Sequence, residues 1–597
     1  MSRHVEPARA VYSESVVISH QHLESAARII IDQLGPKGIE LVGGQKWWQW
    51  RGPMNDLHGE WIEMKSDRNE RIRQGRQRCN RVMLYVHGGA FFFGSVDTHR
   101  YMLERHAKRL KGQVFAPQYR LAPQFPFPCA LQDCFAAYLY LLTIHRPSEI
   151  LLAGDSAGAG MVLSMLCTIR DRNLPLPAGA ILISAWVDLT HSFPSVIKNR
   201  ATDYVPPMGF GSKPSIAWPV LEDHEVCAIR QKAKQKRASN NQQNGMIQEE
   251  DPHARSNADT LRVVIDGETV EIKRQIHLYT TNRLITHPLV SPIAQPSLGG
   301  LPPLYFLCGG AEMLRDEQVY IAHKASTSGA HVYAPSDAIL DEHDPNREII
   351  NKYEPTYVQL QVWDSLCHAA PTFTCIRAAK HMYNAISQFG AWALSRAQNA
   401  GIDILSDPDF NGPTSSSAIA AENTFSRNKK KTERPSVGKA GDILPPFHKH
   451  LIRQRVDEDG HIFPLERSTI LLLLRRPRSE VCAINPDLAK QWLIAQKEYD
   501  LKFAKAKRRV RRQMESYPEC ERLESGESPP PVALVARRPI PGTLPQRQVH
   551  RNCGILMWSR WPFGRRGDPD NEAGTDLLVD GSKRSSESDE NTSNRGD

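Results

Sequence analysis

A strand, a tight glycine turn and a helix follow one another between residues 150 and 166, and this succession limits the fold more than any other feature. The run at 150–153 is apolar, as in a short buried strand, and 161–166 reads as the apolar side of a helix. Between them stands Gly154-Asp155-Ser156-Ala157-Gly158. Glycines lack the Cβ atoms that would collide in so sharp a turn, which presents the Ser156 hydroxyl at the end of the strand. The pattern predicts an α/β fold with a mostly parallel sheet, and it makes Ser156 a candidate nucleophile.

A second glycine-rich segment lies upstream of this turn. His87-Gly88-Gly89-Ala90 follows an apolar run at 82–86 that is typical of a strand. A hydroxyl that attacks a carbonyl carbon creates a negatively charged oxygen, which fixed N–H donors must stabilise. Small residues let the backbone approach closely, so we expect Gly88, Gly89, Ala90 and Ala157 to supply these donors. Taken alone, the segment also fits an ordinary turn after a strand.

Several further segments occur in the order found in a known family. The chain resembles the hormone-sensitive-lipase branch of the α/β-hydrolases over residues 75–400, and within it the fungal members. This resemblance implies an α/β-hydrolase fold, with a mostly parallel sheet between helix layers and an N-terminal cap. Ala90 stands where the family usually has a third glycine, which leaves the backbone donor in place. The additional segments that carry the resemblance are Tyr119-Arg120-Leu121-Ala122-Pro123, Ser184-Ala185-Trp186-Val187-Asp188-Leu189, Pro288-Leu289-Val290-Ser291-Pro292 and Gly300-Leu301-Pro302-Pro303.

A nucleophilic serine needs a base, and the base needs an orienting carboxylate. In this fold the chain order is nucleophile, acid, histidine. His368 is our candidate base, because it lies on a short loop after a strand-like run at 357–363, where the resemblance also places the histidine. Aligned with the family pattern Asp-Pro-Leu-x-Asp-Glu, Glu312 takes the acid position, and Asp316 is the alternative.

Two further aspartates are predicted to be structural. Asp155 lies beside the serine on the tight turn, where neighbouring side chains point apart. We expect Asp155 and Asp133 to accept hydrogen bonds from the Tyr119-Arg120 segment.

Composition limits which binding partners and which cellular compartment we expect for the chain. Its 597 residues include 75 Lys and Arg against 66 Asp and Glu, and a net charge of +9 at this length does not favour nucleic-acid binding. The 11 cysteines show no Cys-x-x-Cys pair or zinc spacing, which indicates reduced thiols and no metal site. We see no apolar run long enough for a secretory signal or a membrane-spanning helix. We therefore expect an intracellular protein, cytoplasmic or peripheral to a membrane, without metal or organic cofactor.

The chain divides into three predicted parts. Residues 1–74 form an N-terminal cap or lead-in segment, whose Trp47-Trp48-Gln49-Trp50 cluster either lines an acyl pocket or simply packs. Residues 75–400 form the hydrolase domain, interrupted by a polar insertion at 223–257 that is too hydrophilic to bury much surface. Residues 401–597 read as a low-complexity, mostly disordered tail.

One amphipathic helix, at 486–514, is predicted within this tail. Asn485 can cap it, and Pro486 suits its first position. Three interpretations stay open: packing on the hydrolase core, contact with a membrane surface, and nuclear import or nucleic-acid use of the basic end. Its apolar stripe consists of Leu488, Trp492, Ala495, Tyr499, Phe503, Ala506 and Val510, and its far end carries Lys505, Lys507, Arg508, Arg509, Arg511 and Arg512.

The resemblance implies hydrolysis of a small-molecule carboxylic ester, lipophilic or with a short acyl group, through an acyl-enzyme. Two alternatives remain open. One is a non-catalytic binding protein on the same scaffold, and His368 stands at the position that such proteins have lost. The other is a deacetylase or formamidase with the same catalytic residues. The oligomeric state is left open.

Overall fold

The computed structural model describes residues 8–51, 56–205, 260–327, 332–343, 347–402 and 436–516, with 527, 529–530 and 532–533. The predicted insertion at 223–257 lies outside them, and so does most of the tail beyond 516. All described residues belong to one compact unit, Met1–Gly554.

The strands are β1 Val11–Ile18, β2 Leu57–Met64, β3 Val82–Val86, β4 Gln113–Pro117, β5 Ile150–Asp155, β6 Gly179–Ile183, β7 Leu261–Ile265, β8 Glu268–Ile272, β9 Leu304–Gly309, β10 Val358–Trp363, β11 Gly438–Lys439, β12 Leu451–Val456 and β13 His461–Pro464. The helices are α1 His20–Leu41, α2 Lys65–Arg73, α3 Val96–Leu110, α4 Cys129–Ile144, α5 Ala157–Asp171, α6 Ser195–Lys198, α9 Arg315–Ala325, α10 Asp337–His343, α11 Arg377–Gln398, α13 Arg467–Leu474, α14 Pro486–Lys502 and α15 Ala504–Ser516, with 3-10 turns at Pro147–Glu149, Asn282–Leu284, Pro292–Ala294, Arg347–Asn351, Ala370–Thr372 and Arg478–Glu480.

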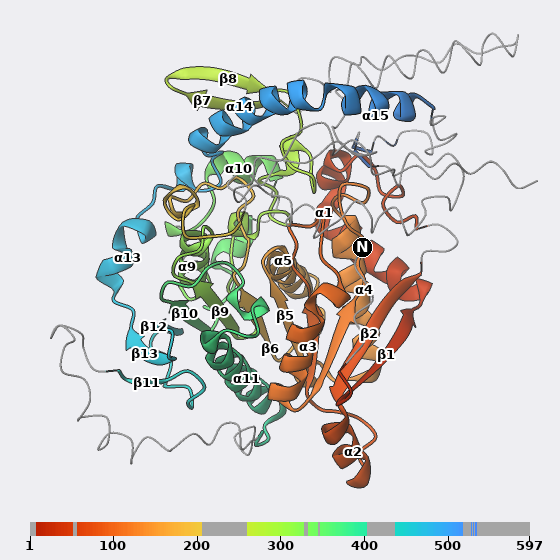
Figure 1. Ribbon diagram of the computed structural model, residues 1–597, viewed down its shortest axis with the longest axis vertical. Coiled ribbons are helices and arrows are strands. Elements are labelled where there is room, and N and C mark those ends of the chain that lie inside the picture. Colours follow the sequence, from red (N-terminus) through yellow and green to blue (C-terminus); the bar gives the residue numbers. More distant parts are fainter. Residues whose placement is uncertain are drawn as a thin grey trace, which may run out of the picture. The chain divides into compact units, whose positions relative to one another are not determined.

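A central sheet organises the described chain (Figure 1), in the strand order β1-β2-β4-β3-β5-β6-β9-β10-β12-β13-β11. The inner strands, from β4 to β12, run parallel to one another, while β1, β2, β13 and β11 pair antiparallel at the two ends. Strands β3, β5, β6, β9 and β10 are buried along their whole length, as expected for a parallel sheet covered on both faces. The predicted mostly parallel α/β sheet is therefore confirmed.

Helices cover both faces of this sheet and create two cores. Successive residues of a strand point to opposite faces, so neighbours in β3 enter different cores. Leu84 packs with residues of α1, α4 and α5, whereas Tyr85 packs with residues of α3 and α11. The carboxyl ends of β3, β5, β6, β9 and β10 lie at the same edge of the sheet, because these strands are parallel.

The N-terminal segment is more than a cap. Strand β1 pairs with β2, and β2 pairs with β4, so this segment adds two strands to the central sheet. Trp47 and Trp48 are fully buried in the core beneath α1, and their ring N–H groups donate to the carbonyls of Val42 and Gly44. Of the two interpretations of this tryptophan cluster, ordinary packing therefore holds for Trp47 and Trp48.

The prediction that the hydrolase domain ends near residue 400 is wrong. Strand β12 pairs in parallel with β10 over six residues, and β13 and β11 extend the sheet further. Val456 is completely buried in the same core as α11. The sheet therefore includes residues 438–464, which lie in the part predicted to be a mostly disordered tail.

The predicted tail helix is two helices, α14 and α15, separated at Phe503. The Asn485 side chain accepts from the amides of Asp487 and Leu488, which confirms the predicted cap. Trp492 is buried in the main hydrophobic core, and Leu488 packs with residues that follow β6 and β9. The apolar stripe of α14 therefore packs against the protein, while most of the basic side chains of α15 are exposed.

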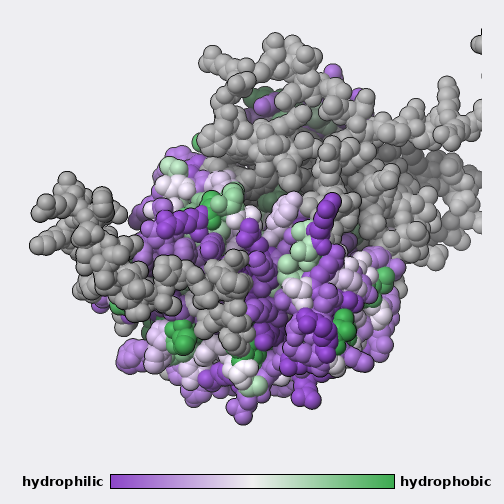
Figure 2. Space-filling model, turned by 60° about the horizontal axis from the view of Figure 1, so that its bottom comes forward, coloured by the Kyte–Doolittle hydropathy of each residue, from purple (hydrophilic) through white to green (hydrophobic). Residues whose placement is uncertain are grey.

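The surface of the face in Figure 2 is mainly hydrophilic, with hydrophobic residues scattered over it. Over the described ranges, no helix is long and apolar enough to cross a membrane. No cluster of His, Cys, Asp or Glu suited to a metal ion occurs in that same part of the chain. The eight cysteines that the structure describes are all free thiols.

Candidate active site

Ser156 lies at the junction of β5 and α5, in a strained backbone conformation. Its φ of 52° and ψ of −123° are unusual for a residue with a side chain, and such a conformation costs about 1–3 kcal/mol. The turn closes against strand β3, where a Cβ on Gly154 would come within 2.7 Å of the Val86 carbonyl oxygen, and one on Gly158 would overlap it. These two glycines are therefore required for the turn that presents Ser156.

The glycine segment after β3 faces this turn, but its four predicted donors are not equivalent. The amide of Gly88 already donates to Oδ1 of Asp155 at 2.9 Å, so it is not available to a substrate. Gly89 has a φ of 120°, and a Cβ there would overlap the Phe93 carbonyl. Within the described chain, the amides of Gly89, Ala90 and Ala157 have no protein acceptor. The structure therefore leaves three of the four predicted backbone donors free.

Asp155 is buried among donors that hold it as a carboxylate. Besides Gly88, the Tyr85 hydroxyl donates to it at 2.9 Å, and His99 Nε2 lies 3.4 Å away. Burial alone would raise the pKa of Asp155, but the charge and hydrogen bond of His99, together with the other two donors, lower it to about 2. The prediction that Asp155 binds the Tyr119-Arg120 segment is wrong, since its partners come from β3 and α3.

Asp133 does have the predicted partner. Its carboxylate accepts from the amide, Nε and Nη2 of Arg120, each at 2.9 Å, and it is fully buried. Arg51 adds a second ion pair to the same carboxylate at 2.6 Å. The N-terminal segment is therefore tied to α4 through this carboxylate.

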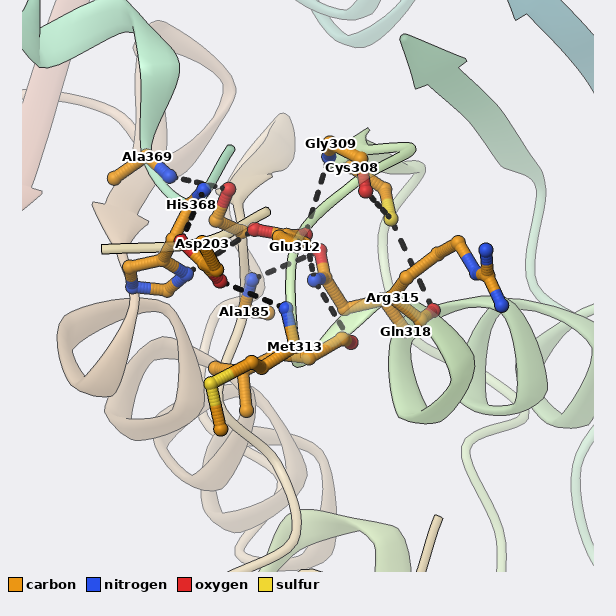
Figure 3. Close-up of polar contacts among 12 residues, drawn as sticks. Ala185, Asp203, Cys308, Gly309, Glu312, Met313, Arg315, Gln318, His368 and Ala369 are labelled. Atoms are coloured by element: carbon orange, nitrogen blue, oxygen red, sulfur yellow. Dashed lines mark hydrogen bonds and ion pairs between the residues drawn. The ribbon is translucent and has the colours of Figure 1, made fainter. Parts of the chain in front are cut away.

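His368 and Glu312 meet at the carboxyl ends of β10 and β9. Nδ1 of His368 lies 3.1 Å from Oε2 of Glu312, and both side chains are buried (Figure 3). The second oxygen, Oε1, accepts from the Gly309 amide at 3.1 Å and from Nε2 of Gln318. Burial lowers the pKa of His368, but the hydrogen bond and charge of Glu312 raise it above its ordinary value.

Asp316 does not contact His368. Its Oδ2 accepts from the Ser195 amide at 3.0 Å, and its Oδ1 pairs with Arg315 at 2.8 Å. It lies in the first turn of helix α9, where these partners direct its carboxylate away from the imidazole. Of the two predicted acids, the structure brings only Glu312 to the histidine.

The end of strand β6 joins the serine turn to the histidine loop. The Ser156 amide donates to the carbonyl of Ile183 at 2.9 Å. The Ala369 amide, directly after His368, donates to Oγ of Ser184 at 2.8 Å. Two consecutive residues at one strand end therefore hold the candidate nucleophile and the candidate base in the same region.

Sequence reasoning missed two polar side chains at this site. The carboxylate of Asp203 accepts from the amides of His368 at 3.1 Å and Met313 at 2.7 Å. Gln318 bridges Glu312 and the Ala185 amide, to which it lies 3.0 Å away. Neither residue belongs to a sequence motif described above. Gln318 follows the candidate acid Glu312 by six positions and lies on α9, so its place in the sequence is the one signal that could have indicated it.

Comparisons with known proteins agree with this fold. A family model described as the alpha/beta hydrolase fold matches residues 83–211 and 241–336. An acetyl-hydrolase of Streptomyces hygroscopicus is 29% identical over 264 residues, which cover 44% of this chain and 67% of that protein. An esterase of Acinetobacter venetianus is 34% identical over 143 residues, which cover 24% of this chain and 47% of the esterase.

A solved structure gives a more distant likeness. The crystal structure of an esterase from the bacterial hormone-sensitive lipase family is 22% identical, with a TM-score of 0.37, covering 66% of this chain and 87% of that one. The matches to the curated relatives span two thirds of the acetyl-hydrolase and about half of the esterase. The chain has the α/β-hydrolase fold, and its sequence is similar to those of esterases and acetyl-hydrolases.

Proposed function

We propose that this chain is a carboxylic ester hydrolase that works through an acyl-enzyme on Ser156, with His368 as base and Glu312 as acid. The observation that carries the proposal is the buried pair between His368 and Glu312 beside the strained serine turn. This chemistry requires, among other groups, a buried carboxylate on Nδ1 of the base and a serine held at the end of a strand. The relatives named esterase and acetyl-hydrolase support the same reaction class.

In the first half of the reaction, Glu312 determines which ring nitrogen of His368 carries the proton. Its Oε2 accepts from the Nδ1–H of His368, which leaves Nε2 unprotonated. Nε2 takes the proton of the Ser156 hydroxyl as Oγ attacks the acyl carbon. The negative charge passes to the former carbonyl oxygen, where the free amides of Gly89, Ala90 and Ala157 stabilise it.

In the second half, the proton returns and water enters. The imidazolium of His368 donates its Nε2 proton to the leaving alkoxide, which departs as the alcohol and leaves an ester on Ser156. Nε2 then takes a proton from water as its oxygen attacks that ester. Collapse of the second tetrahedral intermediate returns the proton to Ser156 and releases the carboxylic acid.

Aromatic side chains near the reacting groups support an apolar substrate. Phe91, next to the oxyanion segment, stacks on Tyr279 with ring centroids 3.9 Å apart. On the histidine side, the ring centroid of Tyr204 lies 6.2 Å from that of His368 and 5.5 Å from that of Phe373, and both aromatic rings are exposed. The leaving alcohol must approach His368, so these two exposed rings favour an apolar alcohol group. We therefore propose a lipophilic or short-acyl ester: the exposed rings support the lipophilic alcohol, and the relative named acetyl-hydrolase supports the short acyl group.

A panel of esters tests this proposal. We expect the purified chain to hydrolyse p-nitrophenyl acetate and butyrate, and Ser156→Ala to lose this activity while keeping the thermal unfolding midpoint within a few degrees. Ser66→Ala, at an exposed serine of α2, is the matched control and should stay fully active. Full activity in Ser156→Ala would overturn the proposal. Faster cleavage of an N-acetyl or N-formyl amide than of any ester would favour the deacetylase or formamidase instead.

For the tail, we propose membrane contact through a smaller set of residues than the sequence predicts. The stripe of α14 is not free for a membrane, because Leu488 and Trp492 pack against the core. Among the described tail residues, the exposed basic side chains of α15 are the group that an anionic lipid surface would attract. The fungal assignment and the intracellular setting stay predictions.

A further inference from the structure

The two loops that carry Glu312 and His368 come from different parts of the chain. Glu312 follows β9, and His368 follows β10, with 56 positions between them. A hydrogen bond of 3.1 Å between their side chains requires that both backbones be held in a fixed relative position, because small displacements of catalytic groups are costly. Strands β9 and β10 pair with each other, and the Gly310 and Ala311 amides donate to the carbonyls of Trp363 and Leu366 at 2.6 and 3.0 Å. These bonds lie at the start of the two loops, so the backbones of Glu312 and His368 themselves need a further connection.

One carboxylate, that of Asp203, contacts both loops. Oδ1 of Asp203 accepts from the backbone amide of His368 at 3.1 Å, and Oδ2 accepts from that of Met313, next to Glu312, at 2.7 Å (Figure 3). Each oxygen thus serves one loop, and the rigid carboxylate plane sets the spacing between the two amides. An ionised acceptor strengthens both bonds, roughly doubling what a neutral acceptor would provide.

The segment that presents Asp203 is itself anchored to the acid loop and to helix α14. Nδ2 of Asn199 donates to the Glu312 carbonyl at 2.8 Å, and the Thr202 hydroxyl donates to the Ala311 carbonyl at 2.8 Å. On its outer side, Nη1 of Arg200 donates to Oε1 of Gln491 in α14 at 2.8 Å. This segment is therefore a bridge of fixed geometry between the acid loop, the histidine loop and the tail.

We infer that Asp203 is a positioning residue for the proposed reaction: it holds the backbones of His368 and Met313 so that Glu312 meets the imidazole. The inference rests on the proposed function and names a residue that acts through two others without touching the substrate. Its negative charge also favours the protonated imidazole, so its effect extends to the pH dependence.

Asp203→Asn tests this role. An amide side chain has one acceptor oxygen and one NH₂ group, so it can serve only one of the two backbone amides and repels the other. We expect kcat for p-nitrophenyl butyrate to fall about ten- to a hundredfold, as for a misplaced catalytic pair, with KM changed much less. Loss of the charge should also move the acid limb of the kcat/KM profile to lower pH.

Asp203→Glu separates geometry from charge. It keeps the charge but shifts both oxygens by one methylene, so kcat should fall while the acid limb stays at the wild-type pH. Asp364→Asn is the matched control: this carboxylate also follows β10, but it pairs with Arg455 at 3.4 Å, and its removal should leave kcat and the profile unchanged. A merely structural role for Asp203 would lower the unfolding temperature without shifting the acid limb.

Wild-type activity and loss of activity in Ser156→Ala are measured first, so that failure of the proposed function is recognised separately. If the wild type is active and Asp203→Asn keeps kcat within twofold and the acid limb in place, the inference is overturned. If Asp203→Asn does not fold, Asp203→Glu decides, and wild-type kcat in that variant would also overturn it.

Discussion

Replacing Glu312 by Gln tests how the structure assigns the acid. Oε1 of Glu312 faces two donors, the Gly309 amide and Nε2 of Gln318, whereas Oε2 faces Nδ1 of His368. In Glu312→Gln, the single acceptor oxygen of the new amide will therefore stay toward Gly309 and Gln318, and its NH₂ group will face the imidazole. Nδ1 must then accept, which places the remaining proton on Nε2, where it blocks removal of the Ser156 proton.

The expected loss follows from this change of tautomer. In a serine protease triad the equivalent Asp-to-Asn change leaves the geometry intact and lowers kcat roughly 10⁴-fold, which corresponds to about 5 kcal/mol of transition-state stabilisation. We expect a loss of that order, with the fold unchanged because the side chain keeps its shape. Glu312 also raises the pKa of His368, so the residual activity should show its acid limb at lower pH.

Steady-state hydrolysis of p-nitrophenyl butyrate across the acid limb and the neutral plateau measures both effects. Asp316→Asn is the matched control, because Asp316 lies in the first turn of α9 and contacts Ser195 and Arg315 but not the imidazole. It should cost little in kcat. A mild Glu312→Gln together with a crippling Asp316→Asn would refute the assignment and return the acid to the alternative that the sequence left open.

Two further variants test other parts of the account. Gly89→Ala should lower kcat about a hundredfold, because the new Cβ overlaps the Phe93 carbonyl at a φ of 120° and moves a proposed oxyanion donor. Unchanged kcat on p-nitrophenyl acetate would show that Gly89 does not have this role. A chain ending at residue 402 should be insoluble or molten, because it loses four buried side chains from the cores: Ile452, Val456, Ile462 and Trp492. Burial of each contributes about 1.5–3 kcal/mol, whereas the total free energy of unfolding of a protein is only about 5–15 kcal/mol. A chain ending at residue 540 keeps all described contacts and should unfold like the full chain in a thermal scan, whereas a cooperative, active 1–402 fragment would contradict the sheet order.

Local patterns were enough to predict the centre of the fold. The apolar runs of β3 and β5, each followed by glycines, identify buried parallel strands and the turns after them, because a fully buried strand must be apolar throughout. The outer strands could not be found in this way. Strand β12 reads Leu-Ile-Arg-Gln-Arg-Val and is only half buried, so its polar residues resemble those of the tail around it.

Only those residues of the site that belong to sequence motifs could be predicted. Glu312 and Asp316 stand four positions apart in one polar stretch, and only the path of the loop decides which carboxylate meets His368. Asp203 lies 165 positions from His368 and belongs to no motif, so its two backbone contacts arise entirely from tertiary structure. Gly88 failed as a donor for a similar reason, since its partner Asp155 lies 67 positions away.

Covalent labelling tests the central claim, that Ser156 is the nucleophile, most directly. The full chain is treated with a fluorophosphonate probe, and the modified residue is located by peptide mass spectrometry. We predict one probe per chain, attached to the peptide that contains Ser156, with no labelling of Ser156→Ala and slow labelling of Glu312→Gln. Attachment to another serine, or equal labelling of wild type and Ser156→Ala, would contradict the proposed mechanism.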